Sequence, residues 1–378
     1  MSNTKVWRTY TAAIFSQMAS ICGNIKVTSE KRIVNSEKGN RSVVGRLILA
    51  VLVIGLVPIK TKAQDIHLTQ FYTAQQNLNP ALAGQYDGAY RAAGNYRHQW
   101  PQINKAITTA MIAFDKKFFF YNDEIDAGIL LINDNYSGFN LNTTKIFLTG
   151  SYKKMLKGHE LRGGVQMGYV LKSTDLSSQT FPTQWDYQQG IFDTQVSNGE
   201  TDLSESQSFF DMNLGFAWSH KFKKFKPTVG FSIFHITRPK DTYFSTQTER
   251  LRSRQVVHAE VDVPISDDFT VEPKFLYMWT TKVQDMIIGS NIKYHMDHPF
   301  FKNIYVGLLY RGGIGRNSDM ITPVAGFHIK NFDIGLNYDV NVSALSANSS
   351  QKTTFEISII YTAPLFAPKS LTIPCDRY

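Results

Sequence analysis

The fold class is decided by the stretch Phe209-Phe210-Asp211-Met212-Asn213-Leu214-Gly215-Phe216-Ala217-Trp218-Ser219-His220. Its even positions carry large apolar residues up to Trp218, and its odd positions from Asp211 onward carry polar or small ones. Side chains on a β-strand point alternately to opposite faces, so this strand has one apolar and one polar face. A soluble β-sandwich and a membrane barrel with an apolar outer surface both produce this pattern. The rest of the chain has to decide between them.

Alternating segments recur from Ala89 to near the end of the chain. We expect about fourteen strands of about ten residues each, the length of a tilted strand that crosses a bilayer. No stretch after residue 63 has a long helical period, so the sequence predicts an all-β fold. The expected strands are 90–99, 106–118, 125–135, 143–155, 160–172, 209–220, 226–236, 254–265, 269–280, 283–296, 303–311, 320–330, 332–341 and 352–362.

The connectors between these segments sort by length. If the first strand starts in the periplasm, the even-numbered connectors return there, and all of them are short. The odd-numbered connectors, such as 173–207 and 237–253, are mostly longer and rich in small polar residues, although the one at 281–282 is short. Aromatic residues also gather at the strand ends, as is typical of the two interfaces of a membrane. Core packing in a soluble β protein is the alternative explanation. The sorting favours a transmembrane antiparallel β-barrel with short periplasmic turns and longer extracellular loops, located in a bacterial outer membrane.

The positive charge of the chain is concentrated at its beginning. The formal charge is +9, but ten of the 40 Lys and Arg residues and only two of the 31 acidic residues lie in 1–63. The remainder is nearly neutral, so we expect no nucleic-acid binding. The apolar run 47–59 is shorter than the roughly 20 residues of a membrane-spanning helix, and Ala63 follows it closely. This layout predicts a signal peptide cleaved after Ala63, with a membrane anchor as the alternative.

The boundaries of the mature chain follow from this leader, residues 1–63. Because the leader is long, we expect the true start codon to lie downstream, with a processed leader as the other interpretation. Residues 64–88 do not alternate, Asn79-Pro80 favours a turn, and Gly84 can end a short helix. We interpret 64–88 as an irregular plug or cap segment, 89–362 as the barrel and 363–378 as a periplasmic tail. Cys375 would be alone in the mature chain, so we expect no intramolecular disulfide.

Motifs of enzymes and metal sites are weak in this sequence. Gly312-Gly313-Ile314-Gly315-Arg316 lacks the Gly-Lys-Ser/Thr end of a phosphate loop. His295-Met296-Asp297-His298 has no second cluster of ligands beside it, and no Gly-x-Ser-x-Gly motif accompanies the histidines. We therefore expect no catalytic residue, no metal and no cofactor.

The predicted inner face carries charges of both signs. These charges can pair across a narrow, plugged interior, which we prefer, or line an open polar channel. The inward residues are Arg91, Asn95, Arg97, Gln99, Asp211, Asn213, His258, Glu260, Asp262, Glu272, Lys274, Asn337 and Asp339.

Both ends of the mature chain carry distinctive motifs. They are Gln64-Asp65-Ile66-His67-Leu68-Thr69-Gln70-Phe71-Tyr72, Asn77-Leu78-Asn79-Pro80-Ala81-Leu82-Ala83-Gly84, Tyr96-Arg97-His98-Gln99-Trp100, Phe114-Asp115 and, at the end, Pro374-Cys375-Asp376-Arg377-Tyr378. These motifs resemble those of the PorP/SprF family of the Bacteroidetes type IX secretion and gliding system. The departures from the family pattern are Thr69 in place of the usual Ser, Asp376 in place of the second Pro, and the insertion Gln75-Gln76 before the Asn-Pro block.

The resemblance implies a non-enzymatic outer-membrane barrel that supports secretion or cell-surface anchoring of a large adhesin. Its partners would be outer-membrane lipid, the surface adhesin cargo and other periplasmic and outer-membrane type IX components. A general porin or hydrophobic-solute transporter is the alternative. Asn79-Pro80 would fix a turn that Arg97 and Trp100 anchor at the first strand, or these residues only seal the barrel. The structural or docking candidates are Asn79, Pro80, Ala81, Gly84, Arg97, Trp100, Pro374, Cys375, Arg377 and Tyr378.

Overall fold

The computed structural model describes residues 68–365, except 102–105, 121–122, 139, 177–178, 194, 200–202, 245–248, 282, 314–317 and 344–352. The chain divides into two units, Met1–Ile59 and Lys60–Tyr378, and every described residue belongs to the second. The predicted leader, residues 64–67 and the end of the chain from residue 366 lie outside the described residues.

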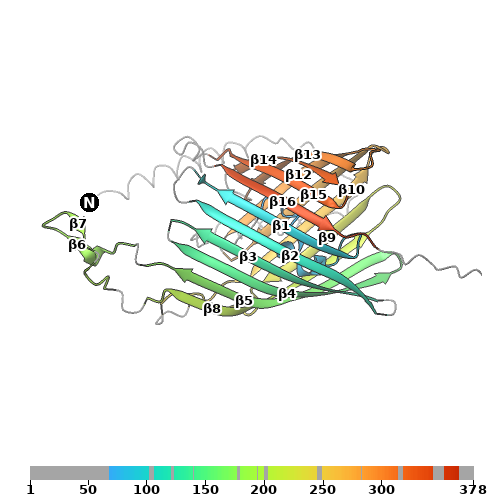
Figure 1. The fold of residues 1–378 in the computed structure, drawn as a ribbon. Coiled ribbons are helices and arrows are strands. Elements are labelled where there is room, and N and C mark those ends of the chain that lie inside the picture. Colours follow the sequence, from blue (N-terminus) through green and yellow to red (C-terminus); the bar gives the residue numbers. More distant parts are fainter. Residues whose placement is uncertain are drawn as a thin grey trace, which may run out of the picture. The chain divides into compact units, whose positions relative to one another are not determined.

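The strands of the described chain form a closed barrel of fourteen, in which neighbouring strands are antiparallel (Figure 1). β16 pairs with β1, with Ala93 opposite Ile360, and this pairing closes the barrel. The predicted fold class and strand number are confirmed. The barrel strands are β1 (Tyr90–Gln99), β2 (Ile107–Phe120), β3 (Asp123–Tyr136), β4 (Leu141–Leu156), β5 (His159–Thr174), β8 (Ser206–His220), β9 (Lys226–Phe234), β10 (Arg254–Pro264), β11 (Phe269–Trp279), β12 (Gln284–His295), β13 (Phe301–Gly312), β14 (Ser318–Ile329), β15 (Phe332–Asn341) and β16 (Thr354–Thr362).

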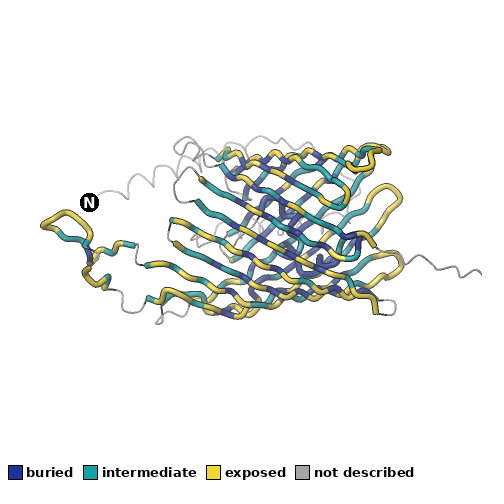
Figure 2. Tube along the Cα trace, viewed as in Figure 1, coloured by how far each residue is buried: buried dark blue, intermediate teal, exposed yellow. Residues whose placement is uncertain are grey.

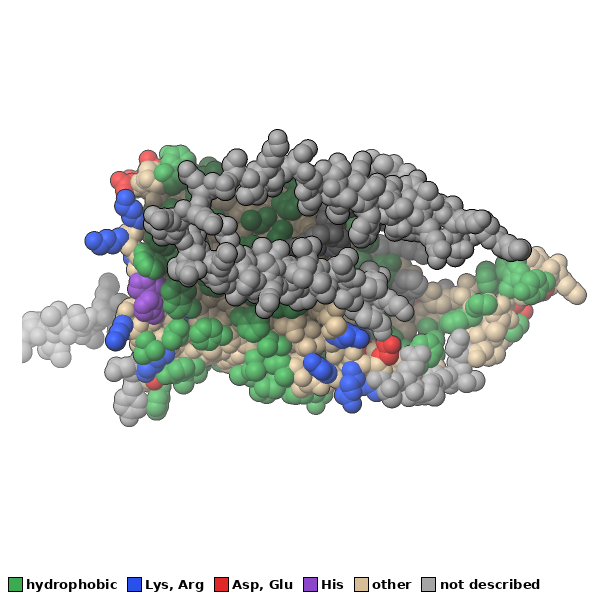
Figure 3. Space-filling model, turned by 180° about the vertical axis from the view of Figure 1, so that it is seen from behind, with side chains coloured by type: hydrophobic (Ala, Val, Ile, Leu, Met, Phe, Trp, Pro, Cys, Tyr) green, Lys and Arg blue, Asp and Glu red, His purple; other side chains and the backbone are tan. Residues whose placement is uncertain are grey.

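The two faces of β8 show how the alternation builds the wall. Phe210, Leu214 and Phe216 are exposed on the outside, whereas Asp211 and Asn213 are buried inside. Figure 2 shows the same alternation of buried and exposed residues along the other strands. The apolar face of the decisive stretch therefore meets lipid, as a membrane barrel requires. Figure 3 shows hydrophobic side chains along the outer wall, histidine beside basic side chains at one end, and further basic side chains along the lower edge of the view.

β1 and β15 have the expected ten residues, whereas several other strands are longer. β4 and β5 have 16 residues each, and β8 has 15. β9 ends at Phe234, two residues earlier than predicted, because His235 has a left-handed backbone (φ 58°). The His235 N–H donates to Asn213 Oδ1 at 3.0 Å, and its Nδ1 lies 2.6 Å from Asp211 Oδ2. These bonds to β8 hold His235 at the end of the strand.

The connector between β5 and β8 contains short elements of its own. These are the 3₁₀ turn η3 (Pro182–Gln184) and a hairpin of β6 (Trp185–Asp186) and β7 (Ile191–Phe192). The rings of Trp185 and Phe192 pack edge to face with centroids 4.8 Å apart. The sequence predicted only a loop here, because strands of two residues are too short to show a period.

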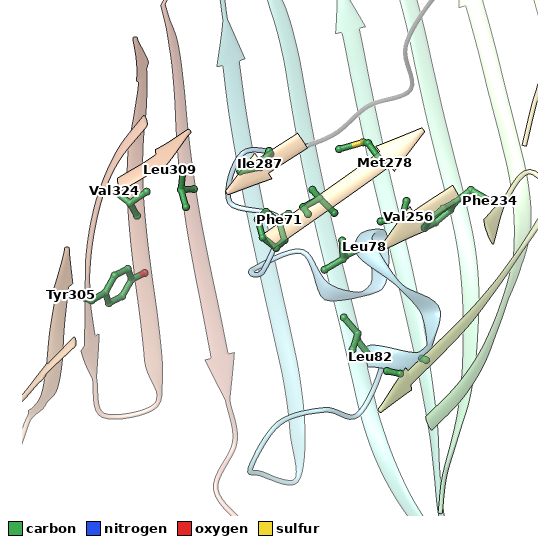
Figure 4. Close-up of a cluster of buried hydrophobic side chains, with 13 residues drawn as sticks. Phe71, Leu78, Leu82, Phe234, Val256, Met278, Ile287, Tyr305, Leu309 and Val324 are labelled. Atoms are coloured by element: carbon green, nitrogen blue, oxygen red, sulfur yellow. The ribbon is translucent and has the colours of Figure 1, made fainter. Parts of the chain in front are cut away.

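Before the first strand, the chain forms two short helical turns, α3 (Gln75–Leu78) and η1 (Pro80–Leu82). Phe71, Leu78 and Leu82 pack in one cluster with the inward-facing Val256 and Leu276, as Figure 4 shows for the labelled side chains. None of the described helices has the length and hydropathy to cross a membrane.

Candidate functional site

Residues 68–84 lie inside the barrel and are held to its wall by many buried hydrogen bonds, and we name them the lumen segment. Thr69 Oγ1 accepts from Arg97 Nη1 at 2.9 Å, and Thr73 Oγ1 accepts from Asn95 Nδ2 at 2.7 Å. Further along the segment, Gln75 accepts from Arg91, near the start of β1. The lumen segment therefore runs antiparallel to β1, from the half of the barrel with the long loops to the end with the short turns.

At the long-loop end, one carboxylate holds the backbone of the lumen segment. Glu356 Oε1 accepts from the Thr69 N–H at 2.8 Å and Oε2 accepts from the Gln70 N–H at 3.0 Å. Arg97 pairs with Glu356 and lies 3.5 Å from Asp339. All five residues are buried, so the guanidinium supplies the counter-charge that two buried carboxylates need.

In the middle of the lumen, Asn79 organises a turn and joins it to the wall. Its Oδ1 accepts from the Ala81 N–H at 2.9 Å and so caps η1, while Pro80 occupies the first position of the turn. Its Nδ2 donates to Phe216 O at 3.0 Å and lies 3.1 Å from His258 Nε2. One buried amide thus links η1 to β8 and β10.

At the short-turn end, the segment leaves the lumen at Gly84. The Gly84 N–H donates to Asp115 Oδ2 at 2.7 Å, and Arg91 binds both oxygens of Asp115 at 3.0 and 2.9 Å. Gly84 has a left-handed backbone (φ 78°), and a Cβ there would lie 2.0 Å from Asp126 Cγ. Only glycine fits at this position.

Arg162 on β5 completes this end of the site. Its Nη1 donates to Ala83 O at 3.2 Å and to Asp126 Oδ2 at 2.9 Å, and its Nη2 pairs with Glu124 at 2.6 Å. Arg162 therefore ties the last turn of the lumen segment to β3 and β5 through bonds that are buried and charge-assisted.

Three inward-facing glycines on neighbouring strands make room for η1, and we name them the glycine seat: Gly164 on β5, Gly215 on β8 and Gly230 on β9. Gly164 pairs directly with Gly215. A Cβ on Gly164 would lie 2.4 Å from Ala81 N, and one on Gly215 would lie 1.9 Å from Asn79 Oδ1. Sequence analysis missed this feature, although glycines at inward positions of adjacent strands are a signal of a close backbone approach.

The structure separates the predicted candidates into groups. It places Asn79, Pro80 and Ala81 on the glycine seat and Gly84 at the short-turn end, while Arg97 lies with Thr69 near the long loops. Trp100 follows β1 with a left-handed backbone (φ 57°), and its N–H donates to Thr353 O at 2.9 Å. Pro374, Cys375, Arg377 and Tyr378 lie outside the described residues.

The predicted inward residues line the lumen. All are buried apart from Gln99, Glu260 and Asp262, which are half-buried. The carboxylates of Glu260, Asp262 and Glu272 lie within 4.8 Å of one another. Lys274 pairs with Glu260 and, at 3.2 Å, with Glu272, and Lys293 pairs with Glu272 as well. The two lysines supply the counter-charge of this acidic group.

A cavity of about 240 Å³ lies beside the lumen segment. Its walls carry charges of both signs, including Lys117, Arg162, Glu160 and Asp262. It can hold water or a small polar solute next to η1.

Residues 60–361 match the model of a family described as type IX secretion system membrane protein PorP/SprF. The chain belongs to the PorP/SprF family. The resemblance drawn from the terminal motifs is confirmed, and this PorP/SprF barrel is a protein of the bacterial outer membrane. A comparison with curated proteins finds no match.

Three solved structures are among those similar to this PorP/SprF barrel. The CymD monoaromatic hydrocarbon channel is 9% identical with a TM-score of 0.46, covering 78% of this chain and 93% of that chain. The toluene transporter TbuX of Ralstonia pickettii is 8% identical with a TM-score of 0.43, covering 77% and 94%. A FadL homologue of Pseudomonas aeruginosa is 11% identical with a TM-score of 0.40, covering 75% and 92%.

Proposed function

We propose that this barrel is a non-enzymatic component of the type IX secretion and gliding machinery that supports secretion or cell-surface anchoring of a large adhesin. The observation that carries the proposal is the lumen segment, which is hydrogen-bonded to β1, β2, β4, β5, β8, β9, β10, β15 and β16. A lumen occupied in this way suits a rigid scaffold that presents loops and turns to partners better than a passage for solutes.

Membership of a secretion family supports the non-enzymatic role. The charged residues of the lumen are engaged in holding the segment: Arg97 with Glu356, Arg91 with Asp115, and Arg162 with Asp126. In this proposal, Asn79, Pro80, Ala81, Gly84, Arg97 and Trp100 act structurally by fixing the segment and the end of β1. The tail at 374–378 would dock a periplasmic partner.

The test is affinity purification of the full chain from its native outer membrane in mild detergent, followed by mass spectrometry. We expect a large surface adhesin and other type IX components in stoichiometric amounts. Recovery of the barrel alone would contradict the anchoring role. Repeating the purification with the 374–378 tail deleted would show whether the tail carries the contact.

A porin or transporter remains the second candidate function, because the cavity of about 240 Å³ beside the segment has polar walls. Planar-bilayer recordings of the purified full chain distinguish the two. Stable single-channel conductance without any partner would favour the porin, and closed membranes would favour the scaffold.

A further inference from the structure

A continuous stack of aromatic rings lies at the short-turn end of β5 and β8. The ring centroids of His159 and His220 are 4.2 Å apart, those of His220 and Phe222 are 4.5 Å apart, and those of Phe222 and Phe225 are 4.8 Å apart. Trp218 joins the stack against His159 at 6.0 Å. We name these five residues the turn stack.

Hydrogen bonds fix the two turns that carry the turn stack. The Phe222 N–H donates to Phe225 O at 2.9 Å, which closes the β8–β9 turn. His220 Nδ1 bonds to Gly158 O at 2.8 Å, and Trp218 Nε1 donates to His159 Nδ1 at 3.3 Å. The two turns are therefore pre-ordered, so the protein loses little conformational entropy when a ligand packs on these rings.

The turn stack is surrounded by lysines. Lys221, Lys223 and Lys224 alternate with Phe222 and Phe225 in the β8–β9 turn, and Lys157 stands in the adjacent turn. All four lysines are exposed, and within the described chain none of them contacts a carboxylate. The nearest acid in sequence, Glu160, bonds Arg162 at 2.6 Å instead. The rim of the stack is therefore uniformly positive.

The turn stack continues the lipid-facing row of β8. Phe210, Leu214 and Phe216 are exposed to lipid, and Trp218 and His220 follow at the same parity. Phe222 and Phe225 beyond them are 41% and 42% exposed. The short turns lie on the periplasmic side, so the stack reaches the headgroup level of the inner leaflet of the outer membrane.

We propose that the turn stack and its lysines bind the headgroup of an anionic phospholipid in the periplasmic leaflet. The ammonium groups of Lys221, Lys223 and Lys224 contact the phosphate, while Phe222 and Phe225 pack against the glycerol and the first methylenes. Free phosphate shares the charge but not the apolar part, so it would use only the lysines. An acidic peptide would use the charge without needing the lipid-facing position.

The test is native mass spectrometry of the full chain in detergent, with phosphatidylglycerol or phosphatidylethanolamine titrated in. We expect the first phosphatidylglycerol to bind at least about tenfold more tightly than phosphatidylethanolamine, because lysines near the membrane surface attract a headgroup with a net negative charge. The variant Lys221→Gln/Lys223→Gln/Lys224→Gln should remove this preference. The matched control Lys116→Gln/Lys302→Gln/Lys330→Gln takes away the same charge at the same end and should keep it.

Two further experiments distinguish an anionic phospholipid from free phosphate as the ligand. Phe222→Leu/Phe225→Leu keeps the charge and should weaken phosphatidylglycerol binding about threefold or more, since stacked and packed rings are lost. Inorganic phosphate at millimolar concentration should not compete with the lipid. Equal loss in both lysine variants would overturn the proposal, as would full competition by phosphate. Capture of an acidic periplasmic protein by the lysines with no lipid preference would also overturn it.

Discussion

Gly164 shows how much a single missing side chain decides in this barrel. It faces inward on β5, and η1 lies so close that its backbone occupies the place of a Cβ. The preceding residue, Gly163, faces outward, and a Cβ there would meet nothing within 4 Å. We therefore expect an alanine to disturb the packing at position 164 and to be tolerated at position 163.

We predict that Gly164→Ala displaces the lumen segment, with a cost of about 1–3 kcal/mol from overpacking. The readout is the rate at which a maleimide labels Thr73→Cys, a buried position of the segment, in a background that carries Cys22→Ser and Cys375→Ser. Labelling should be faster in Gly164→Ala and unchanged in Gly163→Ala. Equal rates in both variants would show that the segment does not rest on the glycine seat.

Glu356 is the second residue whose substitution should have a large effect, in this case on stability. Its carboxylate accepts two backbone N–H groups and pairs with Arg97. Glu356→Gln keeps an acceptor but leaves a buried guanidinium with less counter-charge, so we predict a loss of about 3–5 kcal/mol in the free energy of unfolding. Urea unfolding in micelles measures it. Glu160→Gln, which removes a more exposed partner of Arg162, is the control and should cost less.

At the scale of elements, the strands and the lumen segment differ in what determines their structure. Apolar and polar residues alternate within each strand, so its outward and inward faces can be predicted from its local sequence alone. α3 has four residues and η1 has three, too few for a stable isolated helix. The lumen segment therefore owes its structure to bonds with the wall.

The outward face of β8 gives a prediction about depth. Leu214 lies midway along the strand on the lipid face, and Ser208 lies on the same face near the long-loop end. We expect Leu214→Arg to cost about 2–4 kcal/mol and Ser208→Arg about 0–1 kcal/mol, because a charge is most costly at the bilayer midplane. Folding titrations into lipid vesicles measure both. Equal costs would mean that the bilayer does not surround β8 as inferred.

For the whole molecule, we expect the lumen segment to limit conduction through the interior. We predict that the full chain shows little single-channel current in planar bilayers and that Gly164→Ala shows openings more often. Gly163→Ala should behave as the unmodified chain does. A large steady conductance of the unmodified chain would argue for the porin function instead.

Much of this protein was determined by the sequence itself. The alternation in 209–220, the recurrence of such segments and the sorting of connectors by length are local properties, so they predicted the barrel and its fourteen strands. The terminal motifs indicated the PorP/SprF family, which the family comparison confirmed. Asn79 and Pro80 were recognised as turn residues because capping is also a local effect.

The tertiary structure alone decided what the lumen segment does. Thr69 and its acceptor Glu356 are 287 residues apart, and they meet only because β16 closes onto β1. The direction of the segment, its seat on Gly164 and Gly215, and its bonds to Asp115 and Arg162 depend on that closure as well. Contacts between residues so distant in the chain produce no periodicity and no motif spacing in the sequence, so they could not be predicted from it. They exist only when the barrel brings the strands together around the segment.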